Sequence, residues 1–300
     1  MNISNTLIII GNGPSFKDID LDLIRNKITY GVNGAYNQYA KIKFYPTFWS
    51  SFDDQWIRSG ERHKDINKML VDPECKIRAF ILLRQKEPWN YVDSYKLTLI
   101  NQYPFPVPLT WEETMDLAAK EISNVKQVPV DVARSLIFDA VSDYSLSNVT
   151  YPELIKYVLG VNSQLHVPPL GLYNYYHGDY PGVISATRVG LFMGYTKFIY
   201  LGVDCSYNAK NKCQYFDNSI TISTDPIESY NHKVLIDGYN SYHENKIYTW
   251  EEYLYKCNSI HEDSFAALQK FNPNVDFCNC SGPKSNLKAI RRGELEKEII

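Results

Sequence analysis

The stretch Leu7-Ile8-Ile9-Ile10-Gly11-Asn12-Gly13-Pro14-Ser15 joins a run of aliphatic residues to a turn rich in glycine. Such an uninterrupted run, mostly of isoleucine, is typical of a strand that is buried on both faces inside a parallel sheet. In the turn, two glycines allow close approach of the backbone, and Pro14 stiffens it; Ser15 can cap a helix. A strand, a glycine-rich turn and a helix N-terminus predict a phosphate or nucleotide site, with a plain strand-to-helix turn as the alternative.

The usual dinucleotide motif fits this turn poorly. Its third glycine would fall at Phe16, and its ribose-binding acid would end the second predicted strand, residues 28–32, where Asn33 stands instead. An amide is both a donor and an acceptor, so it suits a base edge or a sugar hydroxyl. We therefore expect a nucleotide site that does not bind NAD.

Apolar runs and helical patterns alternate along the chain. The runs at 44–51, 77–83, 198–204 and 275–280 predict strands, and the patterns at 111–123, 183–195 and 262–271 predict helices. This alternation predicts one α/β domain over residues 1–300, built on a doubly wound, mostly parallel, Rossmann-like sheet. Residues 206–256 have few aliphatic runs and many tyrosines, so we interpret them as a lid-like insertion. The charged stretch 287–300 predicts a solvated helix.

Ligands bind such sheets beyond the carboxyl ends of the strands. Polar residues follow or end most of the predicted strands: Asn12, Asn33, Ser50, Ser51, Asp204 and Ser281. We expect these side chains to contact the ligand.

Composition and charge narrow the class of protein. A hydrophobic content of 44% is ordinary for a globular domain, and a net charge of −3 gives no reason to expect nucleic acid as a partner. The first apolar run is too short for a signal peptide or a membrane span, which predicts a cytoplasmic protein with at most peripheral membrane contact. An oligomer is compatible with this composition. Six cysteines without C-x-x-C spacing predict reduced thiols, with Cys278 and Cys280 on one face of a strand.

Acidic residues near the first turn imitate a metal-binding motif. Asp18, Asp20 and Asp22 have D-x-D spacing, but acids at the start of a helix are favourable to the helix dipole, and this is the simpler interpretation. Asp53 and Asp54 are placed better for a metal, although a turn or cap is again simpler. We therefore expect no metal and no cofactor.

Several motifs resemble the bacterial lipo-oligosaccharide sialyltransferases of glycosyltransferase family 42 and the related motility-accessory flagellin glycosyltransferases. The resemblance begins with the opening Ile-Ile-Gly-Asn-Gly-Pro-Ser at residues 9–15. It continues at Gly194-Tyr195, residues 199–204, Gln214-Tyr215-Phe216-Asp217 and Phe277-Cys278-Asn279-Cys280-Ser281. These pieces follow one another in the family's order, which is more specific than any piece alone.

The resemblance implies a GT-A-like variant of the fold and a glycosyltransferase that is inverting and independent of metal. A sugar would pass from a nucleotide donor, with a CMP-sialic-acid-like sugar favoured, to a hydroxyl of a glycan acceptor. Together with the strand ends, it implies a donor-binding set of Gly11, Asn12, Gly13, Ser15, Asn33, Ser50, Ser51, Gly182 and Asp204. Tyr207 and Tyr215 match two lid tyrosines that hydrogen-bond the leaving phosphate.

An inverting transfer also needs a base for the acceptor proton, and histidine titrates in the right range. His261 opens the predicted last helix, where the family has its base, and a helix N-terminus would keep the ring neutral. His243 in the lid-like insertion is the alternative base.

Two other classes stay open. One is a nucleotide-dependent pyrophosphokinase resembling the pterin diphosphokinases, which would need magnesium and acids such as Asp53 and Asp204. The other is a non-catalytic module that binds a nucleotide sugar.

Overall fold

A parallel β-sheet forms the centre of the protein. The structure is a computed structural model, which describes residues 5–33, 39, 42–51, 73, 75, 77, 79–82, 111–141, 158–159, 182–206 and 250–300. Within these residues the sheet has seven strands: β1 (Thr6–Ile10), β2 (Thr29–Val32), β3 (Phe48–Ser51), β4 (Ala79–Leu82), β5 (Lys197–Leu201), β6 (Asp276–Asn279) and β7 (Arg291–Arg292). Every neighbouring pair is parallel. The predicted doubly wound parallel sheet is therefore confirmed.

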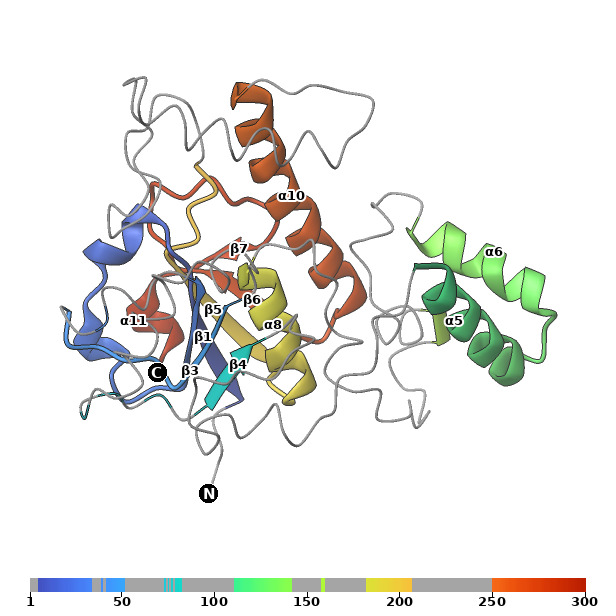
Figure 1. The fold of residues 1–300 in the computed structure, drawn as a ribbon, viewed down its shortest axis with the longest axis horizontal. Coiled ribbons are helices and arrows are strands. Elements are labelled where there is room, and N and C mark those ends of the chain that lie inside the picture. Colours follow the sequence, from blue (N-terminus) through green and yellow to red (C-terminus); the bar gives the residue numbers. More distant parts are fainter. Residues whose placement is uncertain are drawn as a thin grey trace, which may run out of the picture.

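The order of the strands places a switch point next to β1. The strands lie side by side as β4-β3-β2-β1-β5-β6-β7, so the chain builds outward from β1 in one direction and then, from β5, in the other (Figure 1). In open parallel sheets, the loops that leave the two strands at such a point diverge and leave a crevice for a ligand.

Helices cover both faces of this sheet. In the described residues the helices are the 3-10 helices η1 (Pro14–Asp18) and η2 (Leu21–Leu23) and the α-helices α5 (Trp111–Lys126), α6 (Val130–Val141), α8 (Gly182–Phe192), α10 (Trp250–Phe271) and α11 (Leu295–Glu298), and all but α5 and α6 pack on the sheet. One apolar core joins the sheet to α8 and α10, and a second joins it to η1, η2 and α11. The pair α5 and α6 stands to one side in Figure 1 and meets the C-terminal part of α10 through Ala267 and Phe271.

The aliphatic run of β1 supplies both cores. Leu7 and Ile9 pack toward α8 and α10, while Ile8 and Ile10 pack toward η1 and α11, and all four are at most 1% exposed. This is why the strand has no polar alternation: successive side chains point to opposite faces, and both faces are covered.

Helix α8 packs directly on the sheet through a small residue. A Cβ atom on Gly190 would lie 2.6 Å from the ring of Phe198 and 2.7 Å from Leu7. Larger side chains at this position would push the helix away from β1 and β5. The close contact fixes the height of α8 above the sheet, and with it the position of the helix N-terminus at Gly182.

Two predicted helices differ in the structure. The stretch 287–300 is not one charged helix, because Arg291 and Arg292 pair with β6 as β7 and only Leu295–Glu298 is helical. Here tertiary pairing outweighs the charge pattern: Arg291 binds Asp276 on β6, with Nε and Nη2 2.7 Å and 2.6 Å from the two carboxylate oxygens.

The other difference concerns α10, which begins at Trp250 instead of residue 262. Residues 250–256, the last part of the predicted lid-like insertion, therefore belong to this helix. Residues 207–249 of that insertion lie outside the described residues, as do Asp53 and Asp54. No helix in the described ranges is long and apolar enough to cross a membrane.

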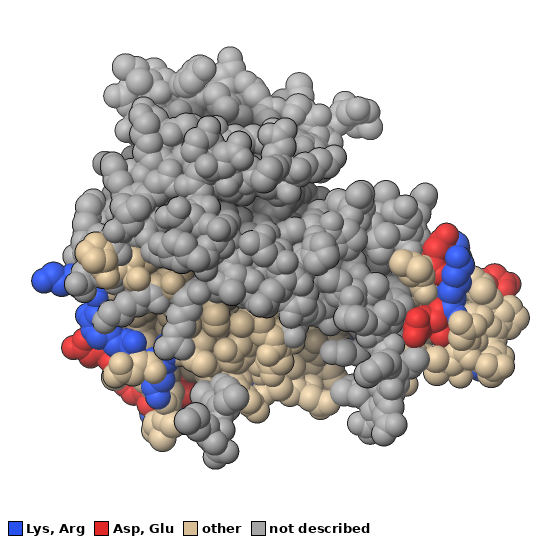
Figure 2. All heavy atoms as spheres, turned by 60° about the horizontal axis from the view of Figure 1, so that its bottom comes forward, with Lys and Arg blue, Asp and Glu red and all other residues tan. Residues whose placement is uncertain are grey.

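Charged side chains are mixed on the surface. In the view of Figure 2, lysine and arginine lie beside aspartate and glutamate at both ends of the described surface, with uncharged surface between them. On the described surface of this view, charges of both signs are interspersed and lysine and arginine do not form a one-sided basic patch.

Candidate functional site

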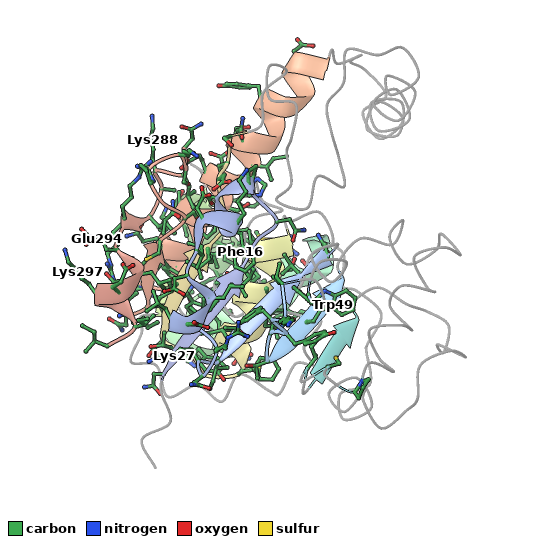
Figure 3. All side chains as sticks on the ribbon, turned by 90° about the vertical axis from the view of Figure 1, so that its left-hand side faces the viewer. Phe16, Lys27, Trp49, Lys288, Glu294 and Lys297 are labelled. Carbon is green, nitrogen blue, oxygen red and sulfur yellow. The ribbon has the colours of Figure 1, made fainter. Side chains whose placement is uncertain are left out.

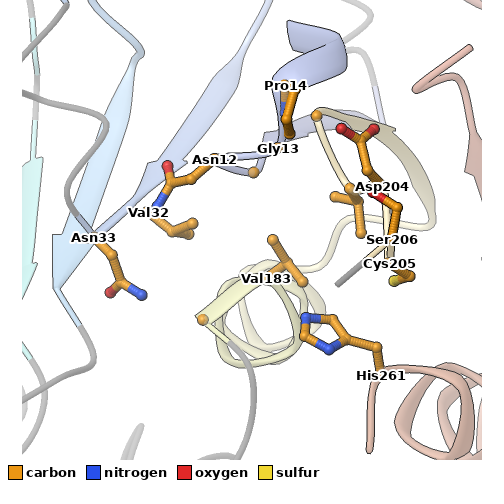
Figure 4. Close-up of a pocket in the computed structure, with 14 residues that line it drawn as sticks. Asn12, Gly13, Pro14, Val32, Asn33, Val183, Asp204, Cys205, Ser206 and His261 are labelled. Carbon is orange, nitrogen blue, oxygen red and sulfur yellow. The ribbon is translucent and has the colours of Figure 1, made fainter. Parts of the chain in front are cut away.

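A pocket lies at the switch point of the sheet. It is bounded by the loops after β1, β2 and β5, by the start of α8 and by α10 (Figure 4). The lining residues are Gly11, Asn12, Gly13, Pro14, Val32, Asn33, Gly182, Val183, Gly202, Val203, Asp204, Cys205, Ser206 and His261. Six of the predicted donor-binding residues therefore meet in one place: Gly11, Asn12, Gly13, Asn33, Gly182 and Asp204.

Backbone contacts join the two loops that form the floor of the pocket. The amide of Gly11 donates to the carbonyl of Leu201 at 2.8 Å, and that of Gly13 donates to Gly202 at 2.7 Å. A Cβ atom would lie only 2.5 Å from the Gly202 carbonyl oxygen if placed on Gly11, and 2.6 Å from it on Gly13. The glycines thus allow the loop after β1 to lie against the loop after β5.

Ser15 connects the same loops through its side chain. Its amide donates to Asp204 Oδ2 at 2.9 Å, and its hydroxyl donates to Asp204 Oδ1. Both residues are buried. The prediction that Ser15 caps a helix is wrong: Gly13 is the N-cap of η1, which has no side-chain cap bond. We call this contact the Ser15–Asp204 bridge, and it explains why Ser15 does not line the pocket.

The bridge also sets the electrostatics of Asp204. Burial raises the pKa of Asp204, while the two hydrogen bonds from Ser15 act in the opposite direction. Since each carboxylate oxygen already accepts from Ser15, Asp204 serves to hold the loop after β1 in place.

Asn12 is the polar side chain at the centre of the pocket floor. Its side chain points along the pocket toward Val32 and Asn33 (Figure 4). The Asn12 Oδ1 atom is buried and accepts no hydrogen bond from the described part of the chain. Burying an amide oxygen without a partner costs ~1–3 kcal/mol. A group held at such a cost inside a pocket is typical of a ligand contact.

Asn33 follows β2 with a backbone conformation that suits its residue type. Its φ of 50° lies in the left-handed region, which asparagine tolerates better than most residues. The indole Nε1 of Trp49 donates to its carbonyl at 3.0 Å. The turn is therefore anchored by β3 while the amide faces the pocket.

The serines of β3 are placed differently from expectation. Ser50 is fully buried, accepts a hydrogen bond from the Tyr30 hydroxyl at 2.9 Å and does not line the pocket. The reason is the strand order, since β2 separates β3 from the switch point. Ser51 ends β3 opposite Leu82, and its side chain lies outside the described residues.

The start of α8 gives the pocket an electropositive side. Gly182 is its first residue, and Gly182 and Val183 both line the pocket. The first amides of an α-helix have no partner within the helix, so a helix N-terminus favours an anion such as a phosphate.

His261 faces this pocket from α10. Its ring lies on the same side as Cys205 and Val183 in Figure 4. The prediction that it opens a helix is wrong, because α10 starts at Trp250 and His261 lies in the helix interior. The argument that a helix N-terminus keeps the ring neutral therefore no longer applies. Its location beside the nucleotide-type pocket was nevertheless predicted from the order of the elements.

A layer of polar residues supports the loop after β5 from behind. The amide of Val203 donates to Ser281 Oγ at 2.9 Å, and Ser285 Oγ donates to the carbonyl of Val203 at 2.8 Å. The amide of Asn286 donates to the carbonyl of Asp204 at 2.7 Å. Ser281, which we expected to contact the ligand, instead holds the pocket wall.

The sequence analysis missed Cys205 and Ser206, which line the pocket after Asp204. Cys205 has a φ of 47°, and burial raises the pKa of its thiol. No sequence motif marks these two residues, although their position directly after a strand-ending acid could have done so. Tyr207, Tyr215 and His243 lie outside the described residues.

The acids near η1 and η2 have structural roles. Asp20 is the N-cap of η2 and accepts from the Asp22 amide at 3.0 Å, and Asp22 pairs with Arg25 at 2.9 Å. The interpretation as acids at the start of a helix is confirmed for Asp20 and Asp22 and wrong for Asp18, which ends η1 and pairs with Lys284 at 3.6 Å. Across the described ranges, no cluster of three or more His, Cys, Asp or Glu side chains could hold a metal ion.

Comparisons with known proteins give a likeness of fold. The sequence matches no known protein family and no curated protein. Among solved structures, it is similar to the monofunctional α-2,3-sialyltransferase Cst-I from Campylobacter jejuni, with 13% identity and a TM-score of 0.42 over 96% of this chain and 79% of that chain.

A second similar structure is the sialyltransferase CstII from the same organism, in complex with the substrate analogue cytidine-5'-monophosphate. It has 12% identity and a TM-score of 0.41 over 97% of this chain and 85% of that chain. Both proteins are sialyltransferases, the class that the sequence motifs resemble. At these values the likeness concerns the fold alone.

Proposed function

We propose that the protein is an inverting glycosyltransferase that transfers a sugar from a nucleotide donor, most simply a CMP-sialic-acid-like donor, to a hydroxyl of a glycan acceptor. The observation that carries the proposal is the buried Oδ1 atom of Asn12, which accepts no bond from the described residues inside a pocket at the switch point. The motif order in the sequence supports the same class of enzyme.

The pocket suits the three parts of a nucleotide sugar. The amides of Asn12 and Asn33 can bind the base edge or the ribose, because each amide offers both a donor and an acceptor. The N-terminus of α8 at Gly182 suits the phosphate. The sugar would then lie toward Cys205 and His261, where the acceptor must approach.

In the proposed reaction, the acceptor oxygen attacks the anomeric carbon of the donor sugar. A new glycosidic bond forms while the bond between the sugar and the phosphate oxygen breaks, and the acceptor proton passes to a nitrogen of His261. The leaving group is the nucleoside monophosphate, which is CMP for the favoured donor. Tyr207 and Tyr215, through the resemblance, would donate hydrogen bonds to that phosphate as its charge grows.

Asp204 separates this proposal from the pyrophosphokinase alternative. A kinase of that type would need Asp204 as a magnesium ligand, but both carboxylate oxygens accept from Ser15. These bonds use one lone pair of each oxygen, and among the described residues that line the pocket no second acid stands beside Asp204 to complete a magnesium site. We therefore propose a transfer that proceeds without a metal.

Incubation with a panel of CMP, UDP and GDP sugars, followed by chromatography of the released nucleotide, tests the proposal. We expect release of CMP from a CMP sugar, faster with a glycan acceptor and unchanged by EDTA. Release of AMP from ATP in the presence of magnesium, with no nucleotide released from the sugar donors, would favour the pyrophosphokinase, and tight CMP binding without release would favour a binding module.

A further inference from the structure

Strand β6 carries two thiols that face each other. Cys278 lies within the strand and Cys280 follows it, so both side chains point to the same face. Their sulfur atoms are 3.6 Å apart, and the residues are 0% and 4% exposed. The same-face arrangement predicted from the sequence is confirmed, and it brings two buried nucleophilic atoms into contact away from the pocket.

The segment after β7 covers this pair. Gly293 lies over Cys278, where a Cβ atom would collide with the sulfur, and Leu295 and Ile299 pack in the same apolar core. In Figure 3, α11 lies beside the sheet with Glu294 and Lys297 directed outward. Residues 293–299, which contain α11, therefore lie over the thiols, and we call this segment the α11 cover.

Ion pairs hold the α11 cover in place. Glu298 pairs with Arg291 at 2.5 Å and with Lys197 at 3.0 Å, and Arg291 also pairs with Asp276. Glu298 lies in the cover, and both of its partners, Lys197 and Arg291, lie in the sheet. Arg291 binds both oxygens of Asp276 and both oxygens of Glu298, so these pairs form a network that is stronger than isolated surface ion pairs. The cover is one short segment, and we expect its local opening to cost less than global unfolding.

The two thiols are not equivalent. The hydrogen bond between them lowers the pKa of Cys280, and the same bond, together with burial, raises that of Cys278. The charge of Arg291 favours the thiolate at both positions, and that of Glu298 disfavours it. Either sulfur can donate this hydrogen bond, and the other sulfur is then favoured as the thiolate. We assign the nucleophile to Cys280, because it follows the strand and is the less buried of the two.

We propose that Cys278 and Cys280 form a modification site, at which a hydroperoxide joins the two sulfur atoms in a reversible disulfide. The Cys280 sulfur attacks one oxygen of hydrogen peroxide, the O–O bond breaks, and hydroxide leaves and is protonated to water. The Cys278 sulfur then attacks the sulfenic sulfur of Cys280 and loses its proton, and the second oxygen leaves as water. Two thiols and one peroxide thus give one disulfide and two waters.

Closure of this bond requires the end of β6 to bend, because alternate Cβ atoms on one face of a regular strand lie about 6.6 Å apart and a disulfide needs about 3.5–4.5 Å, so the disulfide is strained and easy to reduce. A rise of about 3.3 Å per residue places the Cα atoms of alternate residues about 6.6 Å apart, near the upper end of the 4.4–6.8 Å range of disulfides. Disulfides at the edge of the allowed geometry are more readily reduced, which is typical of regulatory bonds.

Closure of the disulfide can reach the pocket through one residue. Ser281 follows Cys280 and accepts from the amide of Val203, which lines the pocket. Drawing the two sulfurs together moves the end of β6 and disturbs this support. This step rests on the proposed function, and we expect the oxidised protein to bind CMP more weakly than the reduced protein.

Peptide mapping tests the modification directly. Trypsin releases residues 271–284 as one peptide that contains Cys278 and Cys280 and none of the other four cysteines. After treatment of the folded protein with hydrogen peroxide, we expect this peptide to be lighter by two hydrogen atoms, and dithiothreitol to restore its mass. In Cys278→Ser, the sulfenic acid on Cys280 should be trapped by dimedone.

A matched pair of variants on α11 tests the role of the cover. Glu298→Gln removes the shared ion-pair partner and a charge that disfavours the thiolate, so we expect disulfide formation roughly two- to tenfold faster. Glu294→Gln removes a charge whose partner Lys297 lies on the same exposed helix, and the rate should not change. Equal rates in the two variants would contradict the opening of this cover.

Three results decide the proposal as a whole. A peptide that stays reduced in the folded protein, or that gains oxygen without losing the two hydrogens, would overturn the modification site. Calorimetry with CMP then compares reduced and oxidised protein. Equal affinities would overturn the link to the pocket, whereas a reduced protein that does not bind CMP would overturn the proposed function and leave the disulfide standing.

Discussion

The Ser15–Asp204 bridge can be weakened by one substitution, Ser15→Ala. The variant removes the hydroxyl that donates to Asp204 Oδ1 and keeps the backbone bond to Oδ2 at 2.9 Å. The two residues are 5% and 6% exposed, so water does not replace the lost donor freely. A hydrogen bond to a charged group contributes ~1.5–3 kcal/mol, and we expect the free energy of unfolding at pH 7 to fall by that amount.

The pH dependence of this loss follows from the raised pKa of Asp204. Because burial raises the pKa of this carboxyl in the folded protein, the folded state binds the proton more tightly than the unfolded chain. The contribution of Asp204 to stability is thus greatest below its unfolded pKa and is lost as the pH rises through its folded pKa. The Ser15 hydroxyl lowers the pKa of Asp204 in the folded protein. Ser15→Ala should therefore lower the free energy of unfolding only at pH values at which Asp204 is ionised.

Urea unfolding at a series of pH values measures this effect. We expect the difference between wild type and Ser15→Ala to be largest at pH 7 and to shrink as the pH falls through the folded pKa of Asp204. Ser135→Ala is the matched control, because Ser135 is an exposed serine on α6 that bonds only to the carbonyl of Asp131. It should change stability by less than ~0.5 kcal/mol. A loss for Ser15→Ala that is absent, or equal at every pH, would refute the reasoning.

Four further substitutions, at Gly13, His261, Tyr207 and Tyr215, probe the loops and the chemistry. Gly13→Ala places a Cβ atom 2.6 Å from both Gly202 O and Asp204 Oδ2, so thermal denaturation should show a loss of ~1–3 kcal/mol, and unchanged stability would contradict the close packing. His261→Ala should lower the transfer rate ~10²–10⁴-fold with CMP affinity intact, whereas retained transfer together with loss in His243→Ala would move the base to His243. Tyr207→Phe and Tyr215→Phe should lower turnover more than donor affinity, with the exposed Tyr255→Phe as the control; an effect on donor affinity alone would exclude the phosphate role.

The sequence predicted the sheet because its signals are local. The run at Leu7–Ile10 and the apolar stretch before Asp204 are each continuous, and a buried parallel strand needs no information beyond that continuity. The edge of the sheet at which the pocket lies could also be predicted, because the carboxyl ends of parallel strands lie at the same edge. Asn12, Asn33 and Asp204 meet there as predicted.

The details that depend on distant contacts were not predictable. Ser15 looked like a helix cap, but its partner Asp204 is 189 residues away, and no local pattern marks such a pair. Ser50 lies next to the end of β3, yet the strand order places it one strand too far from the switch point. The predicted start of α10 was wrong because its first turns carry tyrosines and charges rather than an aliphatic stripe. His261 was therefore predicted at the start of the helix and lies in its interior.

The central claim is that Asn12 binds the nucleotide in the pocket at the switch point. Its Oδ1 atom is buried and accepts no bond from the residues that the structure describes, and under the proposed function Asn12→Ala removes a contact to the ligand. Calorimetry with CMP, on wild type and variant, measures this directly. Loss of one such bond should weaken affinity roughly 5- to 150-fold.

The free energy of unfolding of Asn12→Ala shows whether a loss of CMP affinity comes from the missing contact or from a destabilised fold. Because the Asn12 amide oxygen has no bond to lose in the described structure, Asn12→Ala should leave the free energy of unfolding equal to or above that of wild type. The exposed Asn124→Ala on α5 is the matched control and should change neither quantity. The account predicts weaker CMP binding in a fully stable Asn12→Ala protein. Unchanged CMP affinity in that variant would contradict it.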